Sequence, residues 1–207
     1  MLHIALAKGR IAKTVMRRLQ EGGVSFPTYN DDSRKLIFTD SGNKIKVTLV
    51  KSPDVAVYVR RGAADAGIVG KDVLIEEGSD DVYEILDLGI GKCRMSVSGI
   101  KGTQDVMKKR ILTVASKYPR IAREYFAKRF QPVDIVKLNG SVELAPLVGL
   151  SDVIVDIVET GTTLRENGLE EFDSFMNLSA RLICNKVAYK MKQNELQEFI
   201  SSCKFGE

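Results

Sequence analysis

The chain has 207 residues, of which 44% are hydrophobic and 28% are charged. This composition is that of a globular protein with one large domain or two small ones, and it excludes disorder over most of the chain. Lysine and arginine total 31 against 27 acidic residues, which gives a net charge of +4. A charge this small permits anionic ligands, but it falls short of a nucleic-acid-binding composition, so no nucleic-acid partner is expected.

Cysteine and histidine are scarce. Cys93, Cys184 and Cys203 lie far apart with no CxxC motif, which excludes a disulfide scaffold and a cysteine-rich metal site. His3 is the only histidine, and its place in an apolar stretch favours a structural role. The first residues lack the apolar stretch of a signal peptide, and no run is long enough to span a bilayer. We therefore expect a cytoplasmic protein with no membrane partner.

Strand and helix signals alternate along the first half of the chain. A buried strand gives way at Lys8-Gly9-Arg10 to a helix that Gly22-Gly23 ends. Two strands then flank the turn residues 40–43 as a hairpin, and Pro53 opens a second helix. Strands are expected at 2–7, 35–39, 44–50, 66–69 and 83–88, and helices at 11–21, 52–61 and 71–77.

The second half repeats this alternation. Pro119 begins a helix that Pro132 closes, and Ser141 is expected to cap a helix that ends at Gly149. Residues 153–158 are apolar and β-branched, as in a strand buried on both faces. Strands are expected at 92–98, 111–115, 133–138, 153–158 and 181–187, with a terminal helix at 192–201.

This alternation predicts an α/β fold. Roughly ten strands are many for one compact sheet, so we favour two small α/β lobes. Gly89-Ile90-Gly91 is the expected crossing between them. Composition alone does not reveal where the chain returns.

The strongest chemical motif follows the strand at 153–158. The loop Thr160-Gly161-Thr162-Thr163 offers hydroxyl groups and closely spaced N–H groups, which suit a phosphate monoester. Asp156 and Glu159 stand where open α/β sheets bind ligands and could accept hydrogen bonds from ribose hydroxyls. The alternative is a helix-capping loop beside solvated acids.

Lys8-Gly9-Arg10 has a similar strand-turn-helix pattern, and its two cations suit a polyphosphate. The alternative is an exposed basic turn. Ser33-Arg34-Lys35 and Ser116-Lys117-Tyr118 are weaker anion-binding candidates. Neither a Walker A motif nor a GxGxxG fingerprint is present.

Together these segments resemble the catalytic subunit of ATP phosphoribosyltransferases over nearly the whole chain. The similarity lies in five motifs in matching order: residues 5–10 (ALAKGR), 62–72 (GAADAGIVGKD), 117–119 (KYP), 137–146 (KLNGSVELAP) and 156–164 (DIVETGTTL). Ala7 and Ala56 replace prolines that are common in the family, and Lys51 stands where arginine is usual.

The resemblance implies two α/β lobes similar to type II periplasmic binding proteins, with the active site in a cleft. It assigns residues 1–90 and 184–207 to the first lobe and 91–183 to the second, so the chain would return near Ile183. It also indicates the short form of the family. That form associates with a histidyl-tRNA-synthetase-like regulatory subunit, expected here in a hetero-octamer that confers feedback by histidine.

The implied reaction joins ATP to phosphoribosyl pyrophosphate (PRPP), with Mg²⁺ carried by the substrate phosphates. Arg10 and Arg34 are the expected catalytic residues, since they would stabilise the departing pyrophosphate. The resemblance assigns substrate binding to Lys8, Lys51, Asn139, Glu143, Asp156, Glu159, Thr160, Gly161, Thr162, Thr163 and Leu164. No residue stands out as a general base, and adenine N1 is already unprotonated at neutral pH.

Two other functions remain open. A solute-binding protein would share the two-lobe fold, although the phosphate loop and the missing export signal speak against it. A phosphoribosyltransferase that acts on a free base would share the loop, and a comparison of acceptors would distinguish it.

Overall fold

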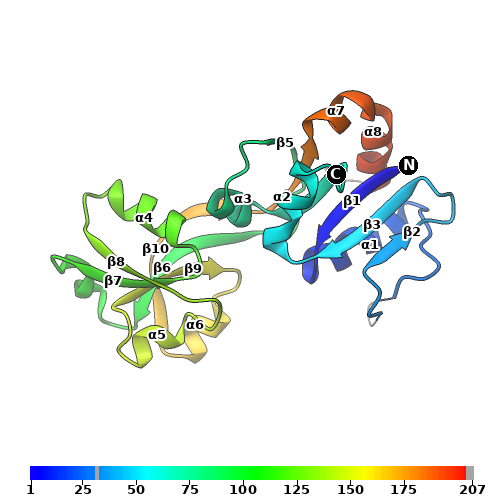
Figure 1. Cartoon of the computed structure of the whole chain (residues 1–207). Helices are drawn as coiled ribbons and strands as arrows, with labels where there is room; N and C mark the ends of the chain where they lie inside the picture. Colours follow the sequence, from blue (N-terminus) through cyan, green and yellow to red (C-terminus); the bar gives the residue numbers. More distant parts are fainter. Residues whose placement is uncertain (31–32, 204–207) are drawn as a thin grey trace. The chain divides into compact units, whose positions relative to one another are not determined.

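The computed structural model describes residues 1–30 and 33–203. The chain divides into two compact units (Figure 1). The first unit contains Met1–Gly91 together with Ser179–Glu207, and the second contains Lys92–Leu178. Each unit is built around its own sheet, which confirms the α/β fold in two lobes.

Among the described residues, the first unit forms a six-stranded sheet with the order β2-β3-β1-β4-β11-β5. Its strands are β1 (Leu2–Ala7), β2 (Ile37–Thr39), β3 (Ile45–Val50), β4 (Ala66–Gly70), β5 (Val82–Asp87) and β11 (Ala180–Asn185). The central β1 pairs in parallel with β3 and β4, and Figure 1 shows it in blue beside the cyan β3. The outer strands pair antiparallel.

Helices cover both faces of this sheet: α1 (Arg10–Glu21), α2 (Ser52–Arg60), α3 (Lys71–Glu77), α7 (Lys186–Met191) and α8 (Gln193–Ser202). Alternate residues of β1 point to opposite faces. Ile4 belongs to the core cluster that contains Val15 of α1 and Phe199 of α8. Ala5 belongs to the cluster that contains Val55 of α2. Because both faces are buried, β1 is apolar nearly throughout.

Residues 92–178, all of which are described, form the sheet of the second unit, with the order β10-β6-β9-β7-β8. Its strands are β6 (Cys93–Ile100), β7 (Leu112–Ser116), β8 (Val133–Lys137), β9 (Val153–Val158) and β10 (Leu169–Leu178). β7 pairs in parallel with β8 and β9, whereas β6 pairs antiparallel with β9 and β10. Its helices are the 3₁₀ turn η1 (Gln104–Lys108), α4 (Pro119–Ala127), α5 (Leu144–Leu147) and α6 (Thr162–Glu166).

β10, the ten-residue edge strand of this sheet, was not predicted from the sequence. Its pairing with β6 shifts register between Glu171 and Asp173 and again between Ser174 and Met176. Such irregularities break the two-residue alternation that identifies a strand in a sequence. The ring of Phe172 also lies against Gly99 of β6, where a Cβ atom would fall 2.5 Å from the ring.

Three expected boundaries were wrong. Ser141 does not cap a helix, because it has a left-handed φ of 47° and α5 spans only Leu144–Leu147. The helix from Pro119 ends at Ala127, well before Pro132. The chain returns to the first unit at Ser179 rather than after Ile183, since Ala180 already pairs with Gly70 of β4.

Two of the three cysteines, Cys184 and Cys203, are buried. No disulfide joins the three described cysteines, and burial raises the pKa of the Cys184 and Cys203 thiols to about 12. Both thiols are therefore protonated and unreactive at neutral pH. In the described part of the chain, no helix has the length and apolarity needed to cross a membrane.

His3 provides a test of the β1 packing. Its Nε2 lies 2.7 Å from the Thr48 hydroxyl, and its backbone N–H donates to Asp65. Burial, followed by the nearby Lys46 and Lys192 charges, lowers the pKa of His3 below 6.5, although Asp65 opposes the shift. The unfolded chain therefore binds more protons than the folded chain just below pH 6.5.

We predict that the free energy of unfolding falls as the pH drops from 7.5 through 6.5 to 5.5, because protonation favours the unfolded chain. Denaturant titrations at several pH values measure this slope. The variant His3→Gln keeps a partner for Thr48 but cannot titrate, so its slope in this window should be smaller. Equal slopes in both proteins would show that His3 is not the group responsible.

Candidate functional site

The cations predicted in the first unit converge on one edge of its sheet. β1 and β3 run in parallel with Ala7 opposite Val50, so Lys8 and Lys51 leave the sheet side by side. The Lys8 N–H donates to the Val50 carbonyl at 2.8 Å, which holds the ends of the two strands together. The antiparallel β2 starts at the same edge, because Leu49 donates to the Leu36 carbonyl at 2.7 Å.

Arg10 and Arg34 both belong to this edge. Gly9 has a φ of 103°, and Arg10 is the first residue of α1 directly after that turn. Arg34 lies in the exposed segment that leads into β2. Four candidate side chains, Lys8, Arg10, Arg34 and Lys51, are thus exposed at a single sheet edge, as a polyanion site requires.

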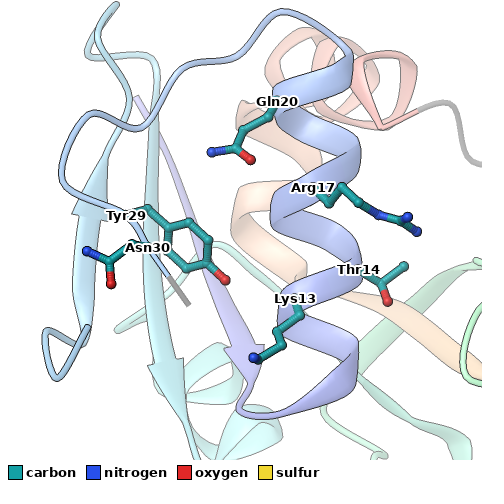
Figure 2. A pocket seen from close by; sticks show the side chains of 6 residues that line it. All are labelled: Lys13, Thr14, Arg17, Gln20, Tyr29 and Asn30. Atoms are coloured by element: carbon teal, nitrogen blue, oxygen red, sulfur yellow. The ribbon is translucent and has the colours of Figure 1, made fainter. Parts of the chain in front are cut away.

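A polar pocket adjoins α1 (Figure 2). It has a volume of about 490 Å³ and is lined by Lys13, Thr14, Arg17, Gln20, Tyr29 and Asn30. Figure 2 shows Lys13, Gln20 and the Tyr29 hydroxyl directed into the space between α1 and the 29–30 segment. Lys13 follows Arg10 by three positions and so lies on the same helix face. This pocket was not predicted from the sequence.

In the second unit, three parallel strands end at one edge. Ser116 ends β7, Lys137 ends β8 and Val158 ends β9. Asn139 and Glu143 follow β8, and the Thr160–Thr163 loop follows β9, so the motifs meet at this edge. Val142, next to Glu143, shares a core cluster with Val158 and Leu164 on either side of the loop. Asn139 is exposed and Glu143 is half-buried.

Ser116 is not available to a ligand, so its part in the predicted anion contact was wrong. Its hydroxyl is buried, donates to the Val155 carbonyl at 2.6 Å and accepts from the Tyr118 N–H at 2.8 Å. Leu164 likewise anchors the loop rather than presenting its side chain, which is only 7% exposed.

The loop itself has a defined geometry. Gly161 adopts a left-handed conformation with φ 73° and ψ 7° and directly precedes α6. The Thr160 and Thr162 hydroxyls lie 3.0 Å apart, and Thr162 N–H contacts the Thr160 hydroxyl at 3.3 Å. Thr160, Thr162 and Thr163 are exposed. Several polar groups are therefore presented within a few ångströms.

Two carboxylates border this loop. Asp156 is half-buried in β9, and its Oδ1 accepts a hydrogen bond from the Ile157 N–H at 2.8 Å. Glu159 is exposed directly after the strand. Acceptors beside a set of donors suit a ligand with both an anionic group and hydroxyl groups, such as a sugar phosphate.

Two arginines that contact the loop were not predicted from the sequence. Arg165 Nη1 donates to the Thr160 carbonyl at 3.0 Å, and Nη2 donates to the Thr162 hydroxyl at 3.1 Å. Arg94 Nη1 donates to the Glu159 carbonyl at 3.1 Å. Spacing on α6 could have identified Arg165, which lies three residues after Thr162. Arg94 could not have been found, because its position depends on the unrecognised pairing of β6 with β10.

Arg94 also forms a bidentate pair with Glu171 of β10. Its Nε donates to Oε2 at 2.8 Å, and its Nη2 contacts Oε1. These hydrogen bonds raise the pKa of the Arg94 guanidinium, so the pair stays ionised. Both side chains are about a third exposed or less.

Comparisons with known proteins agree with these motifs. The family model of ATP phosphoribosyltransferase matches residues 51–204. An ATP phosphoribosyltransferase of Clostridioides difficile is 51% identical over 96% of this chain and 95% of its own length. One from Oceanobacillus iheyensis is 50% identical over 96% of this chain and 94% of its own length.

Solved structures give the same result. A chain of the ATP phosphoribosyl transferase (HisG:HisZ) complex from Thermotoga maritima superposes with a TM-score of 0.84 and 33% identity. The match covers 99% of this chain and 97% of that one. The VFT2 domain of Bordetella pertussis BvgS, with a TM-score of 0.59 and 13% identity, shares the fold alone. On this sequence and structural similarity, the chain belongs to the ATP phosphoribosyltransferase family.

Proposed function

We propose that this chain transfers the phosphoribosyl group of PRPP to N1 of ATP, with release of pyrophosphate, the first step of histidine biosynthesis. The observation that carries the proposal is the Thr160–Thr163 loop with its left-handed Gly161 in a chain of this family. The fold alone would also suit a solute-binding protein. The loop chemistry and the family membership favour the transferase.

The loop is the proposed site of the 5-phosphate. Its exposed threonine hydroxyls can donate to phosphate oxygens, and Gly161 allows the left-handed turn that brings these hydroxyls together. Asp156 and Glu159 are the proposed acceptors for the ribose hydroxyls. Asn139 and Glu143 follow a parallel strand at the same sheet edge and are the further proposed contacts.

The cations of the first unit are the proposed contacts for the pyrophosphate and for the phosphates of ATP. Adenine N1 attacks the anomeric carbon with inversion while the bond to pyrophosphate breaks. Negative charge therefore grows on the departing pyrophosphate. The planar guanidinium groups of Arg10 and Arg34 can stabilise this charge by paired hydrogen bonds to its oxygens. Lys8 and Lys51 add compact positive charges at the same edge.

Magnesium is the proposed cofactor, held mainly by the pyrophosphate of the substrate. The site fits a hard cation, because Asp156 and Glu159 offer carboxylate oxygens of the kind that Mg²⁺ binds. When bound, the ion neutralises part of the pyrophosphate charge. Arg10 and Arg34 supply the protein's own share of that stabilisation.

A regulatory subunit similar to histidyl-tRNA synthetase is the proposed partner, in a hetero-octamer through which histidine would act. The solved relative from Thermotoga maritima is a HisG:HisZ complex, which supports a hetero-oligomer. Histidine bound to a second protein can inhibit only by favouring a less active state of the complex. The proposed assembly is cytoplasmic.

The direct test is release of pyrophosphate by the purified chain from PRPP and Mg²⁺, with and without a co-expressed partner. We expect release with ATP and none with free adenine, guanine, uracil or orotate. Release with a free base instead of ATP would identify a different phosphoribosyltransferase. PRPP that binds but is never consumed with any acceptor would favour a binding protein.

Gly161 and Gly168 provide a matched pair for testing the loop. Both are left-handed, with φ of 73° and 71°, so alanine at either costs roughly 1 kcal/mol of stability. At Gly161 the new Cβ would lie 3.1 Å from Arg165 Nη1, whereas at Gly168 nothing lies within 4 Å. We expect Gly161→Ala alone to weaken PRPP binding, by about tenfold. Equal PRPP affinities in the two folded variants, measured by calorimetry, would contradict the loop assignment.

Arg10 and Arg34 are expected to act in the transition state. Replacing either by alanine should lower kcat by roughly 100-fold, with a much smaller change in KM, because the lost interaction strengthens as charge develops. Arg61→Ala, at the far end of α2 from Lys51, is the control and should leave both constants unchanged. A variant that raises only KM would assign that arginine to ground-state binding.

A further inference from the structure

Two arginine side chains donate hydrogen bonds to consecutive backbone carbonyl groups of the loop. Arg94 Nη1 donates to the carbonyl of Glu159, and Arg165 Nη1 donates to the carbonyl of Thr160. Arg94 is supplied by β6 and Arg165 by α6, so independent elements hold neighbouring peptide groups.

The consequence follows from peptide geometry. In a trans peptide the C=O and N–H groups point in opposite directions, and the described part of the chain contains no cis peptide. The Glu159 carbonyl shares its peptide with the Thr160 N–H, and the Thr160 carbonyl shares its peptide with the Gly161 N–H. Fixing the two carbonyls therefore fixes the direction of two N–H donors. Within the described residues, neither N–H donates a hydrogen bond.

Arg165 and Arg94 differ in whether an acidic side chain pairs with them. Arg94 is neutralised by Glu171, whereas Arg165 forms no ion pair among the described residues. Its second nitrogen instead donates to the Thr162 hydroxyl, which lies 3.0 Å from the Thr160 hydroxyl. These two hydroxyls share one proton in the bond between them, so one hydroxyl proton of the pair is left to donate to a ligand. Arg165 thus presets both a backbone donor and a hydroxyl donor.

We propose that Arg165 is a positioning residue that orients the donors of the phosphate loop, with the Arg94–Glu171 pair as its counterpart on the other carbonyl. This inference rests on the proposed function, in which the loop binds the 5-phosphate of PRPP. Preset donors bind an anion more tightly than donors that must first reorient, because less ordering remains to be done on binding. Arg165 therefore contributes to affinity for PRPP and not to affinity for ATP.

The test compares Arg165→Met, Arg165→Lys and the control Arg123→Met, an exposed arginine of α4. Calorimetry with Mg²⁺ gives Kd for PRPP and for ATP. Loss of the two charged hydrogen bonds in Arg165→Met should raise Kd for PRPP about tenfold or more. Kd for ATP and the melting temperature should not change. Arg165→Lys should remain impaired, because a single ammonium group lacks the planar fork that reaches two acceptors.

A second measurement separates positioning from direct contact with the ligand. The amide ¹H–¹⁵N shifts of Thr160 and Gly161 are recorded without ligand, and we expect them to move in Arg165→Met but not in Arg123→Met. Unchanged shifts with weaker PRPP binding would make Arg165 a direct ligand and overturn the proposal. Full recovery of PRPP affinity in Arg165→Lys would also overturn the proposal, because it would show that a positive charge alone accounts for the effect.

The outcomes also separate this inference from the proposed function. If the wild type binds no PRPP, the proposed function fails, and the unliganded amide shifts still decide whether Arg165 orients the loop. If the wild type binds PRPP and Arg165→Met binds it equally well, the positioning role fails and the function stands.

Discussion

Parallel strand pairing is the constraint on which both sets of candidate residues depend. In the first unit, β1 and β3 end together, which places Lys8 beside Lys51. In the second unit, β7 and β8 end opposite each other and the parallel β9 continues from Val155 to Val158 at the same edge, which places Asn139 near the Thr160–Thr163 loop. The loops that follow parallel strands begin at the same edge of the sheet. Motifs that are far apart in the sequence therefore meet there without any contact between the motifs themselves. A register shift in either sheet would separate them.

Recognition of a phosphate by such a loop depends on backbone direction as much as on residue type. Gly161 provides the left-handed turn, and the buried Leu164 ties α6 to the core beneath it. Two arginines then hold the carbonyls of Glu159 and Thr160. These contacts orient the loop in the absence of a ligand, and donors oriented in advance lower the cost of binding.

Sequence patterns predicted local elements well and long-range pairing poorly. The strands and helices from β1 to α3 were found within a few residues, because each carries a clear period and a glycine or proline boundary. β10 was missed because its two register shifts interrupt the alternation, and α7 was missed because Asn185 caps it directly after β11. Arg94 was not recognised for the same reason, because its role depends on Glu171 of β10. Motifs identified the loop, but only the fold reveals what holds it.

In the proposed function, the Thr160–Thr163 loop receives the 5-phosphate of PRPP. A crystal structure of the protein with PRPP and Mg²⁺ tests it most directly. We expect phosphate oxygens within hydrogen-bond distance of the Thr160 and Gly161 N–H groups and of the threonine hydroxyls. The arginine contacts to the two carbonyls should remain in place. A 5-phosphate bound elsewhere, with the loop empty, would contradict the account.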